Sequence, residues 1–170
     1  MFNEVSDLNV LKFVIFTLRN ASSQEGFKES IEQENSLFDQ IINYFFNNND
    51  IEIQYELSWL LINITYTSNQ FHSKLLKKDI LEKFYEKTFD KRLLIHILWI
   101  INNLTANDKS IIKMISNILP DLKQRLMFLI KSVNSNEVQK LLMDILCTYI
   151  EKVKNKKNLI KVELIYYLVQ

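Results

Sequence analysis

Residues 57–64 of the chain read LSWLLINI, and residues 97–104 read ILWIINNL. Both segments hold a tryptophan that is followed four positions later by an asparagine: Trp59 with Asn63, and Trp99 with Asn103. The two tryptophans are 40 positions apart. Apolar segments that repeat an aromatic residue and an amide in the same register indicate an internal repeat, and an internal repeat largely determines the fold.

The pattern extends toward both ends of the chain. Residues 14–21, VIFTLRNA, hold Phe16 and Asn20, and Phe16 precedes Trp59 by 43 positions. A degraded fourth copy is expected near Met143 and Cys147, where Met143 follows Trp99 by 44 positions. We therefore predict a single repeat domain over residues 1–170, with equivalent helices near residues 10–21, 55–66, 95–105 and 138–150.

The spacing of apolar residues predicts an all-α fold, because they recur at helical intervals and no convincing alternation of period two is found. Polar clusters that predict loops separate the helical segments, at residues 21–23, 47–50, 67–69, 105–108 and 132–135. One glycine and one proline in 170 residues disfavour a many-turned β-sandwich or a glycine-rich phosphate loop. Residues 159–169 are apolar enough to predict a closing helix.

A helical wheel separates two faces in each copy. The predicted core stripes are Leu57, Leu60, Leu61 and Ile64 in one copy, Ile97, Ile100, Ile101 and Leu104 in the next, and Val14, Leu18 and Ala21 in the first. The aromatic residue and the asparagine of each copy fall on the opposite side. Exposed aromatic residues repeated in register favour a binding surface.

The tryptophan–asparagine motif, doubled at this period, resembles the third helix of armadillo repeats, in particular those of importin-α. The resemblance covers roughly residues 8–152, including a short first helix at residues 69–76. It implies a right-handed α-α superhelix, an armadillo-like solenoid of about four repeats.

The resemblance also implies a function. In importin-α the third helices line a concave groove in which tryptophans hold the stems of lysine and arginine and asparagines bind the peptide backbone. By this likeness the chain is a non-enzymatic module for nuclear protein import. It would bind a basic localisation-type peptide in cytoplasm and nucleus, with an importin-β-like carrier as a further partner. The residues carried over are Trp59, Asn63, Trp99, Asn103, Phe16 and Asn20.

Acidic residues that could neutralise a bound lysine are few. Glu56 lies one turn before Trp59, Asp108 follows the Trp99 motif, and the positions equivalent to Glu56 hold Phe13 and His96. A basic peptide is therefore expected to bind weakly. The alternative is a structural scaffold of armadillo or HEAT type that docks on a folded partner within an assembly.

Composition limits the other classes of function. The formal charge of +1 gives no basic excess for nucleic-acid binding, and no apolar run is long enough for a membrane span. Cys147 is the one cysteine, which excludes an internal disulfide and favours a reducing compartment. Without a histidine–cysteine cluster or a catalytic constellation, we predict no enzyme activity, no metal and no cofactor.

Overall fold

The computed structural model describes residues 7–24, 26–67, 69–88, 90–106 and 109–154. This part of the chain is all-helical, which confirms the predicted class, and the predicted closing helix at residues 159–169 and Asp108 lie outside it. The helices are α1 (Leu8–Ala21), α2 (Phe27–Gln33), α3 (Asn35–Asn47), α4 (Ile51–Thr67), α5 (Asn69–Leu75), α6 (Lys78–Lys87), α7 (Leu94–Ala106), α8 (Lys109–Ile118), α9 (Leu122–Ser132) and α10 (Asn136–Lys154).

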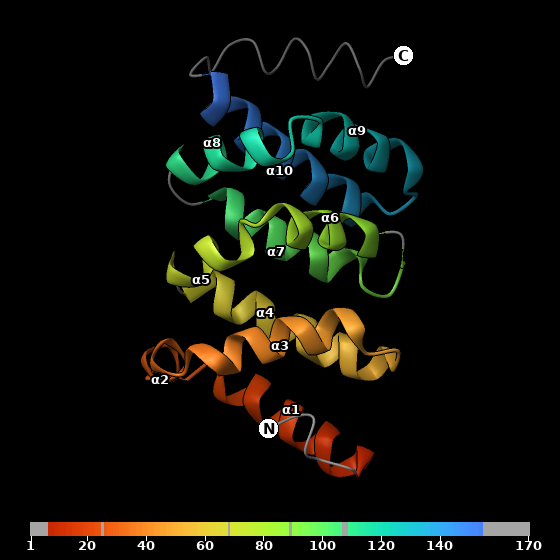
Figure 1. The fold of residues 1–170 in the computed structure, drawn as a ribbon. Coiled ribbons are helices and arrows are strands. Elements are labelled where there is room, and N and C mark those ends of the chain that lie inside the picture. The colour runs from red at the N-terminus through yellow and green to blue at the C-terminus, as the bar shows by residue number, and fades with distance from the viewer. Residues whose placement is uncertain (1–6, 25, 68, 89, 107–108, 155–170) are drawn as a thin grey trace.

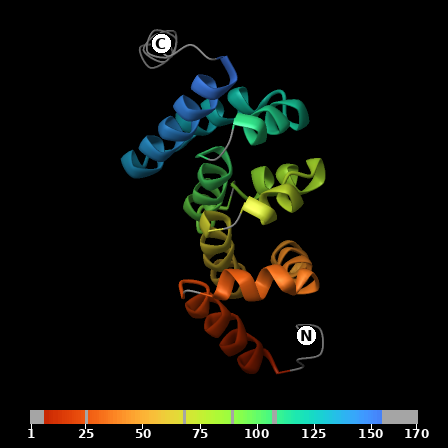
Figure 2. The same ribbon diagram turned by 90° about the vertical axis from the view of Figure 1, so that its left-hand side faces the viewer.

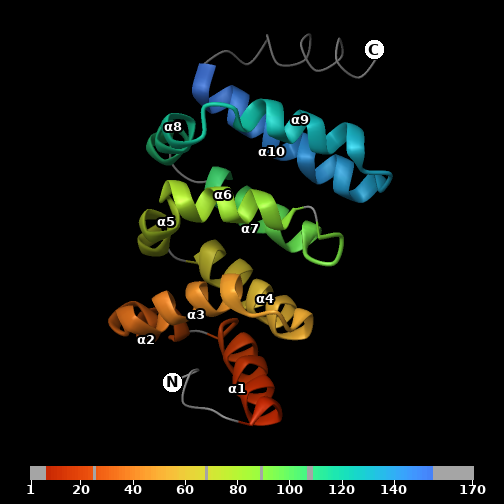
Figure 3. The same ribbon diagram turned by 45° about the vertical axis from the view of Figure 1, so that its right-hand side comes forward.

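The helices are arranged in layers (Figure 1). Helices α1, α4, α7 and α10 coincide with the four predicted equivalent segments, and neighbours in this series pack against each other. Figure 2 shows α1, α4 and α7 one above another on one side of the molecule, while α3, α6 and α9 lie on the other side. Figure 3 shows α2 and α3 beside α4, α5 and α6 beside α7, and α8 and α9 beside α10, with α1 at one end of the stack and α10 in the layer at the other end.

The apolar stripes explain this arrangement. All four stripe residues of α4 and all four of α7 are buried, as the wheel predicts. The prediction for α1 is wrong, because the buried stripe is rotated by about one residue around the helix. Val14, Leu18 and Ala21 are only half-buried, while Leu11 and Ile15 are buried. In the described structure α1 packs mainly against α4, so a narrower stripe, turned toward that helix, is enough.

Side chains also close the ends of helices. Gln54 donates Nε2 hydrogen bonds to the carbonyl oxygens of Phe45 and Asn48 at the end of α3, at 3.3 and 2.6 Å. Gln139 makes the same pair of bonds at the end of α9, to Ile130 and Val133. Carbonyl groups at the end of a helix lack partners within that helix. Each glutamine of a long helix therefore supplies hydrogen bonds to the last carbonyl groups of the shorter helix packed beside it.

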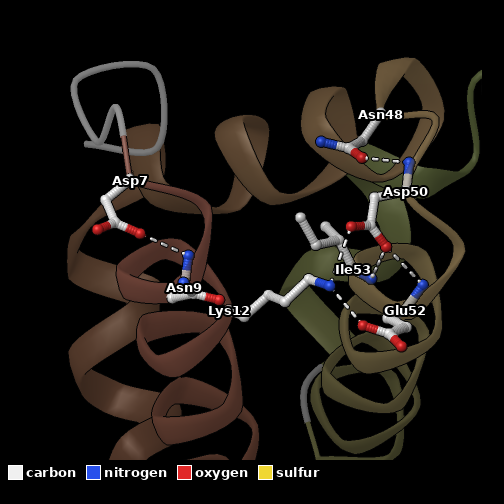
Figure 4. Close-up of polar contacts among 7 residues, drawn as sticks. All are labelled: Asp7, Asn9, Lys12, Asn48, Asp50, Glu52 and Ile53. Carbon is white, nitrogen blue, oxygen red and sulfur yellow. Dashed lines mark hydrogen bonds and ion pairs between the residues drawn. The ribbon is translucent and has the colours of Figure 1, made fainter.

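An ion pair also joins the first two long helices, α1 and α4 (Figure 4). Asp50 caps α4 by accepting hydrogen bonds from the amides of Glu52 and Ile53. Lys12 of α1 reaches across to this end of α4, where its Nζ lies 3.1 Å from Asp50 Oδ2 and also pairs with Glu52. The ammonium group lowers the pKa of the Asp50 carboxyl below its ordinary value.

Truncation on the two faces of α7 is expected to lower stability by different amounts. Ile101→Ala should lower the free energy of unfolding by about 2 to 5 kcal/mol, because it empties a buried position. Trp99→Ala should cost clearly less, since that side chain is already exposed. Urea unfolding followed by circular dichroism measures both. A larger loss for Trp99→Ala than for Ile101→Ala would contradict this assignment of faces.

Candidate functional site

Three equivalent helices each expose the large aromatic side chain of the repeated motif. Phe16 of α1 is 45% exposed, Trp59 of α4 40% and Trp99 of α7 44%. We call these three residues the aromatic row. Their exposure agrees with the wheel, and their helices pack in sequence, α1 on α4 and α4 on α7. A repeated exposed aromatic position on adjacent helices has the character of an interaction surface.

A groove of about 860 Å³ runs along the α1 and α4 end of the row, where Phe16 forms part of its wall. Phe13, which is 70% exposed, and Tyr55 add aromatic surface, and Ile51 adds aliphatic surface. Its charged lining residues carry both signs: Lys12, Glu52, Glu56 and Arg92. An apolar floor with a few charged groups is typical of a ligand-binding groove.

Tyr55, Arg92 and Lys12 were not among the sequence-predicted site residues. Tyr55 stands one helical turn before Trp59, so the spacing rule that selects Trp59 could have found it. Arg92 precedes α7 in a loop, and no periodic signal in the sequence marks it.

The carboxylate of Glu56 already has a partner within the chain. Arg19 Nη1 lies 2.8 Å from Glu56 Oε2, although the geometry is that of an ion pair and not of a hydrogen bond. The Arg19 guanidinium also lies 4.5 Å from the centre of the Phe16 ring, and its Nη2 donates to Asn20 Oδ1 at 3.1 Å. Three predicted site residues therefore surround one arginine that the sequence reasoning did not select.

On α7 the position equivalent to Glu56 holds His96, which is buried against α4. The His96 ring lies 4.4 Å from the Tyr55 ring and 5.1 Å from that of Trp59, measured between centroids. Its Nδ1 is 2.6 Å from Ser58 Oγ, which donates its single proton to the Tyr55 carbonyl oxygen. Burial lowers the pKa of His96 to about 4. A buried, neutral imidazole of α7 thus packs against the rings of Tyr55 and Trp59 of α4.

The asparagines of the motif make contacts between helices. Asn63 Nδ2 donates to Ser22 Oγ at 2.8 Å, immediately after α1. Asn103 Nδ2 donates to Thr65 Oγ1 at 3.2 Å and to the Ile62 carbonyl oxygen at 3.1 Å, both on α4. We call these bonds the asparagine ladder. Each asparagine joins its helix to the hydroxyl that follows the equivalent asparagine of the preceding copy by two residues.

The helical wheel places Asn103 on the side opposite the core stripe, where its side chain is expected to be at least partly exposed. This expectation is wrong: Asn103 is buried, because its amide is turned toward α4. Asn63 is half-buried and Asn20 is exposed. That these three amides bind a peptide backbone stays a prediction.

The fourth copy differs from the others. Met143 and Cys147 of α10 are both half-buried and pack against the core, and burial raises the pKa of the Cys147 thiol. In the part of the chain that the structure describes, no group of three potential ligands could hold a metal ion. No helix there is long and apolar enough to cross a membrane.

Comparison with known proteins bears on the fold alone. No protein-family model and no curated protein matches the sequence. Among solved structures, the chain is similar to the crystal structure of an engineered protein from the Northeast Structural Genomics Consortium, with a TM-score of 0.69 at 16% sequence identity. The match covers 89% of this chain and spans 64% of that protein's length. At this identity the likeness establishes a shared helical arrangement.

The asparagine ladder predicts a position-dependent effect of truncation. Asn103→Ala removes two hydrogen bonds at a buried site and should lower the free energy of unfolding by about 1 to 3 kcal/mol. Asn20→Ala, the equivalent change at an exposed position, is the matched control and should stay within about 0.5 kcal/mol of the parent. Chemical unfolding measures both, and equal losses would show that the ladder does not stabilise the fold.

His96 predicts a stability that falls with acidity. The pKa of His96 is lowered from an ordinary 6.5 to about 4. Between these two values the histidine is protonated in the unfolded chain and neutral in the folded chain. The stability contribution is complete above the unfolded pKa and is lost as the pH falls toward the folded pKa. We expect unfolding to cost about 2 kcal/mol less at pH 5 than at pH 7.5.

The matched variant for this prediction is His96→Gln, which should show a flatter dependence of stability on pH. Part of the slope should remain, because burial also lowers the pKa of His72. Parallel pH profiles for parent and variant, measured by urea unfolding, would contradict the assignment to His96.

Proposed function

We propose that this chain is a non-enzymatic interaction module that holds an extended peptide across the aromatic row. The observation that carries the proposal is the repeated exposure of Phe16, Trp59 and Trp99 on three adjacent helices. We further propose that the layers form an armadillo-type superhelix, because each long helix after α1 follows two shorter ones at the predicted period.

An extended peptide is the ligand form that suits this spacing. Packed helices are about 8 to 10 Å apart, and an extended chain covers that distance in about two to three residues. Successive aromatic residues of the row would therefore meet side chains that are two or three residues apart along the peptide. Aromatic faces accept the aliphatic stems of long side chains and also attract cations, by about 0.5 to 2 kcal/mol each.

The class of peptide proposed is basic, of the nuclear-localisation type that the resemblance to importin-α implies. The Arg19 contacts support this choice, because the chain itself places a guanidinium on Phe16 and against Glu56. Affinity should be micromolar or weaker, since no described carboxylate accompanies Trp99 at the position of Glu56. Transport between cytoplasm and nucleus with an importin-β-like carrier is part of the same proposal.

The second candidate is a scaffold that docks on a folded partner. Aromatic side chains outside the row favour it: Tyr66 at the end of α4 and Phe128 of α9 are both well exposed. A folded partner would contact such scattered positions, whereas a peptide on the aromatic row would not contact Phe128.

The proposal predicts that Trp59 and Trp99 contribute directly to the affinity for a peptide. A labelled basic peptide should bind the parent chain and quench its tryptophan fluorescence, and Trp59→Ala and Trp99→Ala should each weaken binding by roughly tenfold, as expected for losing one cation–π contact. Phe128→Ala, an exposed aromatic change on α9, is the control and should have no effect. Binding that is lost only in Phe128→Ala would favour the scaffold instead.

A further inference from the structure

We infer that Arg19 is an internal occupant of the site between Phe16 and Glu56, and that it determines how the groove discriminates among peptides. We call the space bounded by Phe16, Glu56 and Asn20 the first slot. The inference rests on the proposed function, since it concerns which side chain this end of the aromatic row accepts.

The geometry of Arg19 is that of a bound cationic ligand. Its guanidinium meets an aromatic ring at 4.5 Å, a carboxylate oxygen at 2.8 Å and an amide oxygen at 3.1 Å. These three contacts combine cation–π attraction, charge neutralisation and hydrogen bonding, which are the interactions that a peptide arginine or lysine would seek. The Arg19 and Glu56 side chains are only 23% and 26% exposed, so the pair is partly withdrawn from water.

The first slot differs from the equivalent position one helix further along. There the position of Arg19 holds Ile62, and the position of Glu56 holds His96, which is neutral. Trp59 thus has no carboxylate at the position that serves Phe16. The acidic group suited to a peptide cation lies in the slot that the chain's own arginine fills.

The consequence is that a basic side chain of the peptide gains little affinity at the first slot. A ligand cation that enters the first slot must displace the Arg19 guanidinium, so one ion pair is exchanged for another and little free energy is gained. Removing the Arg19 side chain leaves Glu56 unpaired beside Phe16. The slot then offers an uncompensated carboxylate and a ring face to the ligand.

The test uses a fluorescently labelled peptide of alternating lysine and serine, titrated by anisotropy against the full chain. Arg19→Ala should bind it roughly tenfold more tightly than the parent, as expected for one newly available cation site. The gain should disappear in Arg19→Ala with Glu56→Gln. Arg19→Lys, which keeps a cation on a flexible stem, should gain less than Arg19→Ala.

Two controls separate the inference from its alternatives. Lys131→Ala removes one positive charge at an exposed position of α9, so a tenfold gain there would assign the effect to net charge and overturn the inference. An alternating glutamate and serine peptide should not gain affinity for Arg19→Ala.

The failure of the inference is distinguishable from the failure of the proposed function. If the parent binds the lysine peptide through Trp99 and Arg19→Ala binds it no more tightly, the first-slot inference is wrong while the function stands. If neither the parent nor Arg19→Ala binds the peptide, both are wrong. Tight binding by Arg19→Ala that survives Glu56→Gln would also overturn the role assigned to Glu56.

Discussion

The lateral packing of the long helices is the constraint on which the rest of the structure depends. Apolar stripes supply the driving force, but burial is non-directional and does not by itself fix how far one helix slides along the next. The asparagine ladder supplies that register, since Asn63 bonds to Ser22 and Asn103 to Thr65. A hydrogen bond made at a buried site is costly to leave unmade, so a helix shifted by one turn is disfavoured.

The aromatic row follows from this register. Each ladder asparagine lies one turn after the aromatic residue of its own helix, so fixing the asparagines also fixes Trp59 and Trp99 at matching heights on neighbouring helices. The buried and neutral His96 supports the ring of Trp59 and links it to α7. The surface is thus held by the polar contacts beneath it, and its exposed rings need not contribute much to stability.

Much of this arrangement is readable from the sequence. The period of the motif locates α1, α4, α7 and α10, and the wheel separates the buried stripes of α4 and α7 from their tryptophans. The wheel fails for α1 because it assumes the same neighbours for every copy. It also cannot tell an exposed asparagine from one turned toward an adjacent helix, as Asn103 is, because that depends on a contact across 38 residues. The pairing of Arg19 with Glu56 was hidden for the same reason.

Positions that repeat between the copies lie at contacts between helices, whereas positions that vary lie beside the aromatic row. The asparagines, the hydroxyl residues two positions after them and the core stripes of α4 and α7 recur in register, and they build the layers. The position one turn before the row changes from Phe13 to Glu56 to His96, and the position three after it changes from Arg19 to Ile62 to Asn102. Substitution at these two places changes the charge and shape offered beside each ring without disturbing the ladder. If the surface binds a peptide as proposed, its specificity would come from these departures from the repeat, among them the Arg19–Glu56 pair.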